Sequence, residues 1–206
     1  MNEIQTITNY YQKVAEIYDL NRRFFLFGRK RLIESLSGQY TNLPRILEVG
    51  CGTGTVLLEL YRNYPNSQIV GLDLSEDMLA VTRQKTADIP NITLIHGKFD
   101  IDFIQKPFDL LVFSYALSVF PDLEATLELA QKQLVPGGVI AMVDFFDSNY
   151  DLFRLWISRN IPIRTHFPIQ TLNARFKQEY CKTHRAYFGF WKYFLFIGSV
   201  KSLGKQ

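Results

Sequence analysis

The sequence predicts an α/β protein built on a mostly parallel β-sheet with helices on both faces. Between residues 45 and 145, short apolar segments alternate with helical segments, and this alternation is typical of β-α-β units. The short segments, such as RILEV (45–49) and FDLLVFSYA (108–116), are rich in Leu, Ile and Val along their whole length. Strands buried on both faces have this composition, which favours the parallel sheet.

The central elements follow from periodicity and from start and stop signals. Strands are expected at residues 45–49, 68–74, 91–97, 108–116 and 139–145. Helices are expected at residues 55–64, 75–85 and 123–134. Ser75 is a good N-cap for the second helix, because its side chain can accept a backbone hydrogen bond and two acidic residues follow it at the positive end of the helix dipole.

The first part of the chain is predicted to be helical. Residues 4–36 have apolar side chains at helical spacing, with a break expected at Gly28. We therefore expect residues 1–43 to form an N-terminal helical cap that faces the substrate and the membrane. The main domain is expected at residues 44–206.

The last part of the chain is predicted to extend the sheet. Helices are expected at residues 152–159 and 171–179. Two strand-like runs, residues 182–188 and 191–200, are joined near Gly189 and predict an antiparallel hairpin at the sheet edge. With the five central strands, the hairpin makes a seven-stranded sheet.

Composition and charge limit the class of protein. The chain has 206 residues, of which 47% are hydrophobic and 21% charged, as in a globular protein. Apolar runs such as residues 193–197 are far shorter than the ~20 residues that span a bilayer. No secretory signal is visible at the N-terminus, and two distant cysteines form neither a disulfide framework nor a zinc site. A cytoplasmic protein is expected.

Basic residues are concentrated towards the C-terminus. Residues 150–206 contain 10 Lys and Arg against 2 Asp and Glu, whereas residues 44–149 contain 7 against 14. This asymmetry favours an anionic partner on one side of the molecule. No RNA-binding module or Arg-rich helix is evident, so a nucleic-acid partner is not expected.

The strongest functional signal is the glycine-rich segment LEVGCGTG (47–54), placed between the first strand and its helix. Such a turn lets a ligand lie against the backbone and the helix N-terminus. A dinucleotide fingerprint requires G-x-G-x-x-G, but here the third glycine comes one residue early. A phosphate-binding Walker loop requires a lysine, and none occurs between Arg45 and Lys85. The remaining pattern is an acidic residue, G-x-G-x-G, and Asp73 at the end of the next strand.

Together with GLDLS (71–75) and LVPGG (134–138), this segment resembles the class I S-adenosylmethionine-dependent methyltransferases. The resemblance implies their Rossmann-like fold and S-adenosylmethionine as the cofactor. It implies that residues 50–54 (Gly50, Cys51, Gly52, Thr53 and Gly54) wrap the methionine part. It also implies that Glu48 supports this loop and that Asp73 accepts hydrogen bonds from both ribose hydroxyls.

The expected adenine site departs from the pattern of the family. Members commonly have Gly-Asp after the third strand, whereas this chain has Gly97-Lys98-Phe99. A lysine cannot accept a hydrogen bond from the adenine amino group, so either Phe99 covers the ring or Asp100 replaces the missing acid. Two further side chains either contact the adenine or simply pack in the core; these are Leu74 and Met78.

The methyl acceptor is expected at the end of the fourth strand, where Ser114 and Tyr115 would face the cofactor's methyl group. Methyl transfer from a sulfonium depends mainly on positioning, so no general base is assigned and no metal is expected. Candidate catalytic residues are Tyr18, Tyr115 and His166. Tyrosines at positions 10, 11 and 18 could cover the pocket or pack within a helix.

Over nearly its full length the chain also resembles bacterial lipid-headgroup N-methyltransferases, most closely those that trimethylate diacylglyceryl-homoserine to a betaine lipid. The segments that carry this resemblance are IYDLNRRFFLFGRKRLIESL (17–36), SYALSVFPD (114–122), VDFFD (143–147) and PIRTHFP (162–168). It implies three methylations of one amine, with Arg164 or His166 available for the homoserine carboxylate. Other acceptors remain open: phosphatidylethanolamine, a quinone precursor or a small metabolite.

Two segments combine aromatic and basic residues, namely residues 21–31 and 184–201. Each has two interpretations, burial in the core or peripheral contact with an anionic membrane. For residues 21–31, the membrane interpretation makes a prediction about particular side chains. The basic residues Arg22, Arg23, Arg29, Lys30 and Arg31 would hold the enzyme on the bilayer, with Phe24, Phe25 or Phe27 inserted.

Overall fold

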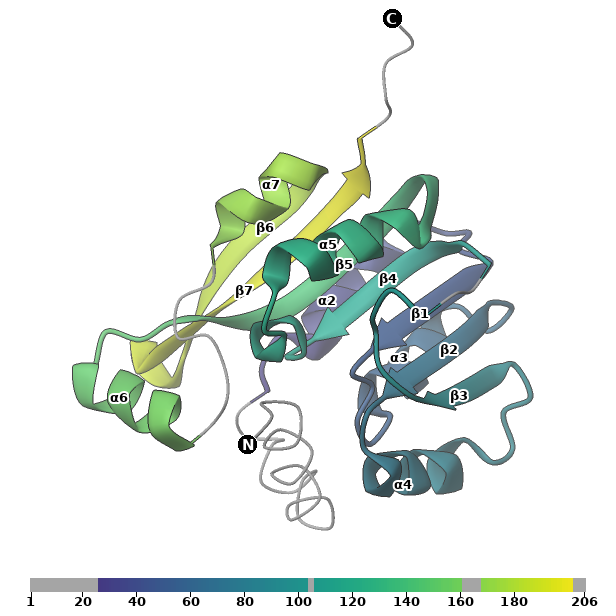
Figure 1. The fold of residues 1–206 in the computed structure, drawn as a ribbon, viewed down its shortest axis with the longest axis horizontal. Helices are drawn as coiled ribbons and strands as arrows, with labels where there is room; N and C mark the ends of the chain where they lie inside the picture. Colours follow the sequence, from purple (N-terminus) through teal and green to yellow (C-terminus); the bar gives the residue numbers. More distant parts are fainter. Residues whose placement is uncertain (1–25, 104–105, 161–167, 202–206) are drawn as a thin grey trace, which may run out of the picture.

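The structure, a computed structural model, describes residues 26–103, 106–160 and 168–201. Its strands form one seven-stranded sheet in the order β3-β2-β1-β4-β5-β7-β6 (Figure 1). The strands are β1 (Arg45–Val49), β2 (Gln68–Asp73), β3 (Ile92–His96), β4 (Phe108–Ser114), β5 (Leu134–Asp147), β6 (Phe176–Ala186) and β7 (Trp191–Val200). Strands β1 to β5 are parallel, and β7 runs antiparallel to both β5 and β6. The predicted Rossmann-like fold with a C-terminal hairpin is confirmed.

Helices cover both faces of this sheet. They are α2 (Arg29–Ser37), α3 (Thr55–Asn63), α4 (Glu76–Thr86), α5 (Leu123–Lys132), α6 (Asp151–Asn160) and α7 (Ile169–Arg175), with short 3-10 turns η1 (Leu117–Val119) and η2 (Tyr187–Gly189). Helices α2 and α3 lie behind the sheet in Figure 1, and α5 and α7 lie in front. Two buried apolar clusters result, one with leucines of α2, α3 and α4 and the other with leucines of α5 and α7.

The starts of α4 and α5 follow local capping rules. The Ser75 hydroxyl accepts a hydrogen bond from the backbone N–H of Met78 at 3.3 Å, so the predicted N-cap of α4 is confirmed. The Asp122 carboxylate does the same for α5, accepting from the N–H of Ala125 at 2.9 Å. These caps fix where each helix leaves the carboxyl edge of the sheet.

The predicted helix at residues 171–179 is wrong in its second half. Helix α7 ends at Arg175, and β6 begins at Phe176. The ring of Phe176 is buried in the core, and its backbone pairs with Val200 of β7. Burial of this ring and the long antiparallel pairing override the helical preference of the local sequence. The strand predicted at residues 182–188 is consequently longer and ends at Ala186.

The start of α2 is part of the protein's own packing. Gly28 precedes the helix with a left-handed φ of 83°, so a helix does begin after Gly28 as predicted; most of the helical segment predicted before it lies outside the described residues. The Phe27 ring lies 5.2 Å from that of Tyr187 and 6.0 Å from that of Trp191. Phe27 thus packs in an aromatic cluster and is half-buried, and the insertion of Phe24, Phe25 or Phe27 into a membrane stays a prediction.

The basic residues of the same segment are also engaged in part. The Arg31 guanidinium contacts the His184 ring nitrogen at 3.1 Å and donates to the Tyr193 hydroxyl at 3.4 Å. Lys30 is exposed and lies 3.7 Å from the Glu34 carboxylate. The other residues predicted to bind the membrane, Arg22, Arg23, Phe24 and Phe25, lie outside the described residues. Within the described ranges, no helix has the length and apolar character needed to cross a bilayer.

Candidate functional site

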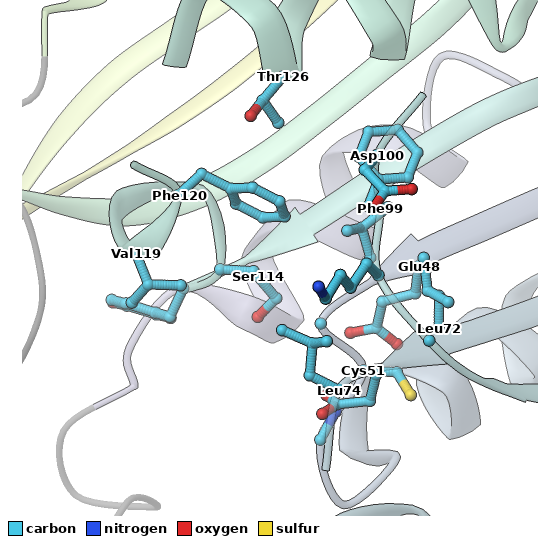
Figure 2. Close-up of a pocket in the computed structure, with 18 of the residues that line it drawn as sticks. Glu48, Cys51, Leu72, Leu74, Phe99, Asp100, Ser114, Val119, Phe120 and Thr126 are labelled. Atoms are coloured by element: carbon cyan, nitrogen blue, oxygen red, sulfur yellow. The ribbon is translucent and has the colours of Figure 1, made fainter. Parts of the chain in front are cut away.

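A cavity of about 570 Å³ opens at the carboxyl ends of β1, β2 and β4. Figure 2 shows Glu48 and Ser114 directed into this space. Nearly all residues that the sequence predicted for a cofactor line it, together with Tyr115. They are Glu48, Gly50, Cys51, Gly52, Thr53, Asp73, Leu74, Met78, Gly97, Lys98, Phe99 and Ser114. Elements far apart in the sequence thus converge on one site.

The glycine-rich turn forms the floor of the cavity. Gly52 has a φ of 54°, and a Cβ added there would meet no atom within 4 Å, so this position faces open space. Gly54 differs from the expectation, because it is not part of the cavity lining. A Cβ at Gly54 would lie 2.6 Å from the Thr82 side chain. The third glycine therefore permits close packing of α3 against α4.

Asp73 connects the glycine-rich turn to β2. One carboxylate oxygen accepts a hydrogen bond from the N–H of Gly52 at 2.7 Å, and the other accepts from the N–H of Ser75 at 2.9 Å. Burial raises the pKa of Asp73, and these N–H groups oppose that shift. Each carboxylate oxygen keeps a further lone pair. Asp73 can therefore accept hydrogen bonds from a diol in the cavity while it holds the turn.

Glu48 and Arg29 place opposite charges in the same cavity. Glu48 is only 1% exposed, and one of its oxygens has no hydrogen-bond partner among the described residues. Burial raises the pKa of Glu48 well above its usual range, and the positive charge of Arg29 opposes the rise. Arg29 donates from Nε to the Ser114 hydroxyl at 3.0 Å. The sequence interpretation missed this role, since it assigned Arg29 to the membrane.

Tyr115 is held in an unusual conformation beyond the end of β4. Its φ is 55°, in the left-handed region that side chains other than glycine rarely adopt. Its hydroxyl donates to the backbone oxygen of Phe27 at 2.8 Å. Burial raises the Tyr115 pKa well above its usual range, and the charge of Asp144 raises it further. The hydroxyl is therefore a hydrogen-bond donor to the protein backbone, and a catalytic role of Tyr115 stays a prediction.

The other candidate catalytic residues, Tyr18 and His166, lie outside the described residues, as do Tyr10, Tyr11 and Arg164. Tyr115 itself is part of the cavity lining. The Cζ atom of Arg29 lies 6.0 Å from the ring centroid, and the Trp191 ring lies 6.4 Å away. This end of the cavity thus combines an aromatic face with one guanidinium.

Asp144 fixes the turn that follows Tyr115. Its carboxylate accepts hydrogen bonds from the backbone N–H of Ser118 at 2.9 Å and of Phe145 at 2.8 Å. Burial raises the pKa of Asp144 to about 6, although these N–H groups oppose the shift. The turn η1 carries Val119 into the cavity wall. A buried carboxylate in the VDFFD segment therefore shapes the site without contacting the cavity.

An aromatic cluster forms a further wall of the cavity. The Phe99 ring lies 5.9 Å from that of Phe113 and 6.4 Å from that of Phe120. Figure 2 shows Phe99 and Phe120 over the cavity. Lys98 and Asp100 line it as well, so Asp100 can supply the acceptor that Lys98 lacks. The sequence interpretation missed Phe120, although it directly follows the turn after β4.

Comparisons with known proteins agree with this geometry. Residues 46–138 match the model of a methyltransferase domain. The demethylmenaquinone methyltransferase of Staphylococcus aureus is 27% identical over 191 residues, which covers 87% of this chain and 76% of the relative. The N-methyltransferase NodS of Bradyrhizobium japonicum, solved with S-adenosyl-L-homocysteine, has a TM-score of 0.72 and 16% identity, covering 98% of this chain and 100% of that chain. The YcgJ protein of Bacillus subtilis has a TM-score of 0.65 and 13% identity, covering 84% and 99%.

The chain therefore carries a methyltransferase domain of the class I fold. It is an S-adenosylmethionine-dependent methyltransferase, and S-adenosylmethionine is its cofactor. The cavity fits this cofactor in two respects. Gly52 leaves room for a ligand against the backbone, and the buried Glu48 oxygen lacks a protein partner within the described ranges, as expected where a cationic ligand binds.

Arg29 is expected to bind the carboxylate of the cofactor's methionine part, because it is a cation on the cavity wall beside Ser114. Arg29→Met should weaken S-adenosylhomocysteine binding by about tenfold to a hundredfold, the range of a charge-assisted hydrogen bond. Calorimetry measures the change. Lys30→Met is the matched control, since Lys30 is exposed on the same helix. Unchanged cofactor affinity in Arg29→Met would show that this cation does not bind the cofactor's carboxylate.

Proposed function

We propose that this enzyme methylates the amine of a lipid headgroup, converting diacylglyceryl-homoserine to its trimethylated betaine lipid. The observation that carries the proposal is Tyr115, an aromatic residue with a left-handed backbone that lines the cavity just beyond the end of β4. An aromatic face attracts ammonium groups, and quaternary ammonium in particular. A ring at this position suits an acceptor that gains methyl groups on nitrogen.

The chain's residues would act by positioning the reactants. The bound cofactor supplies an electrophilic methyl group on its sulfonium. Asp73 and the glycine-rich turn would hold the cofactor on one side, and Ser114 and Tyr115 would border the acceptor on the other. The amine must present its lone pair in line with the methyl group. The mainly apolar lining keeps water from the reacting atoms. Residues 1–43 would cover the acceptor end as a cap.

A quinone precursor is the second candidate acceptor. It is favoured by the relative named demethylmenaquinone methyltransferase, whose similarity extends over 87% of this chain. An aromatic acceptor could stack on the Tyr115 ring, but it carries no amine. The two candidates therefore differ in which atom is methylated and in how many methyl groups are added.

The purified enzyme is expected to transfer labelled methyl groups from S-adenosylmethionine to diacylglyceryl-homoserine dispersed in detergent. Mass spectrometry should show mono-, di- and trimethylated products in succession. Phosphatidylethanolamine and a demethylated quinone are assayed in parallel. Methylation of the quinone alone would overturn the lipid-amine proposal and support the second candidate.

The role of the ring is tested in the same assay. Tyr115→Leu should raise the KM for the dimethylated lipid by about twofold to thirtyfold, because a cation–π contact of ~0.5–2 kcal/mol is lost. Tyr115→Phe keeps the ring and is the control. Equal behaviour of the two variants would show that the aromatic face plays no part in acceptor binding.

A further inference from the structure

The turn between β6 and β7 exposes an aromatic side chain in a strained conformation. Three consecutive residues have positive φ angles: Tyr187 at 47°, Phe188 at 57° and Gly189 at 99°. Glycine, asparagine and aspartate are the residues that normally occupy such positions. Phe188 has the highest exposure of any large apolar side chain in the described ranges, 110% of its reference area. A bulky ring in a position that disfavours it, and fully in water, calls for a functional explanation.

Helix α6 adds a second apolar group beside this turn. Leu152, in its first turn, is 84% exposed. The Ser148 hydroxyl donates to the backbone oxygen of Phe190 at 2.8 Å, and the rings of Tyr150 and Phe190 are 4.9 Å apart. These contacts join the start of α6 to the hairpin turn, and Figure 1 shows the two elements side by side. Phe188 and Leu152 therefore belong to one protruding region.

This region lies on the edge of the sheet that carries the cofactor cavity. Strands β1, β4 and β5 are parallel, so their carboxyl ends share one edge. Strand β7 starts at that edge, because Lys192 pairs with Asp147 near the end of β5. The turn also contacts the cavity's neighbourhood directly, since the Tyr187 ring meets the Phe27 ring at 5.2 Å. The protrusion thus stands beside the acceptor end.

Basic side chains flank the protrusion, and the acidic side chains next to it, Asp147 and Asp151, both pair with Arg154. Arg185 is exposed and pairs across the hairpin with Lys192. Residues 150–206 contain 10 basic and 2 acidic residues. Aromatic and aliphatic side chains flanked by Lys and Arg suit the interface of an anionic bilayer, where the rings enter the headgroup layer and the cations meet lipid phosphates.

We infer that the hairpin turn at residues 187–190, together with Leu152, is a membrane-docking wedge that inserts Phe188 into anionic bilayers. The purpose of this wedge rests on the proposed lipid acceptor, because docking at the cavity's edge brings the enzyme to a substrate held in the membrane. The segment around Phe27 and Arg29, in contrast, is engaged within the protein. The wedge thus lies in the second of the two aromatic and basic segments, residues 184–201, and not in the first, whose side chains the sequence prediction named.

The test is co-sedimentation of the full-length protein with vesicles of equal parts phosphatidylglycerol and phosphatidylcholine. Phe188→Asn should lower partitioning by about tenfold to a hundredfold, since one buried aromatic side chain is lost from the bilayer. Asparagine tolerates the left-handed backbone, so this variant keeps the fold. Phe188→Trp retains an apolar aromatic ring and should partition at least as well as the unaltered protein.

A second pair of variants tests the contribution of basic residues to membrane binding. Arg185→Gln should lower partitioning by about fivefold, and the loss should shrink in 1 M salt, where the Debye length is ~3 Å. Lys177→Gln is the control, because Lys177 is exposed on the same strand but near its far end. It should partition like the unaltered protein.

Several outcomes would overturn the wedge. One is equal partitioning of Phe188→Asn and the unaltered protein; another is that the unaltered protein does not sediment with vesicles. A change of oligomeric state in Phe188→Asn, measured by analytical ultracentrifugation, would show that a second copy covers the turn. The proposed acceptor is tested separately, because detergent-dispersed lipid needs no docking. Vesicle binding through Phe188 without methylation of lipid amines would leave the wedge standing and refute the acceptor.

Discussion

Gly52→Val is expected to give a folded protein that no longer binds S-adenosylhomocysteine measurably. The Cβ at this position enters open space in the cavity, with no protein atom within 4 Å, so the branched side chain would occupy the cofactor's place. The backbone must also keep a φ of 54°, which costs a residue with a Cβ about 1–2 kcal/mol. Calorimetry reports the loss of binding, and thermal denaturation reports the fold.

Gly137→Val is a control that separates the effect of backbone strain from the effect of a side chain that blocks the cofactor cavity. Gly137 has a φ of 76°, and its Cβ would also meet nothing within 4 Å, but it lies at the start of β5, away from the cavity lining. This control should lose similar stability and bind the ligand normally. If Gly52→Val binds within about threefold of the unaltered protein, then this glycine does not contact the cofactor.

Asp73→Ala is expected to have the second-largest effect. Loss of the hydrogen bonds to the ribose should weaken cofactor binding by about 1.5–3 kcal/mol, roughly tenfold to a hundredfold. The structure adds a further loss, because the N–H groups of Gly52 and Ser75 also lose their acceptor. The glycine-rich turn would then be less ordered before the ligand arrives. The total should therefore exceed the ribose contribution alone.

A ligand lacking one ribose hydroxyl divides the two contributions. The unaltered protein should bind deoxyadenosyl-homocysteine more weakly than S-adenosylhomocysteine. Asp73→Ala should bind both equally, since the group that recognised the hydroxyl is gone; such a cycle isolates the pairwise interaction. If Asp73→Ala still prefers the intact ribose by the full factor, the ribose contact belongs to another residue.

The parts of the fold with local causes were predictable from sequence. Ser75 caps α4 through its own side chain, and the LEVG segment leads from a buried strand into the turn. The boundary at Phe176 was not predictable, because it is set by pairing with Val200 and burial in the far cluster. Helical preference is estimated from neighbouring residues, whereas the pairing partner of Phe176 lies 24 residues further along the chain.

The residues of the site can likewise be divided into those that the sequence predicted and those that it did not. Glu48, Gly52 and Asp73 are marked by fixed spacing within one β-α-β unit, and all three line the cavity. Arg29 escaped prediction because its partner Ser114 is 85 residues away. The sequence of a run of basic residues also does not show whether one side chain points into the protein or all of them face the solvent. For residues 184–201 the sequence left burial and membrane contact open, and the structure contains both environments: Trp191 and Tyr193 are buried, whereas Phe188 is exposed.

Two hydrogen bonds join the start of α2 to the end of β4. They couple the attachment of this helix to the binding of the methyl donor, S-adenosylmethionine. Arg29 contacts Ser114, and the oxygen of Phe27 accepts from Tyr115. Suppose that the methyl donor binds only when Arg29 is in place. Donor binding then favours the attachment of α2 to the sheet by the same factor by which this attachment raises the affinity for the donor. At a hundred times the dissociation constant, a ligand contributes about 2.7 kcal/mol to the state that it selects. The contacts of Phe27 and Arg29 with the end of β4 would thus break more often as the donor is depleted.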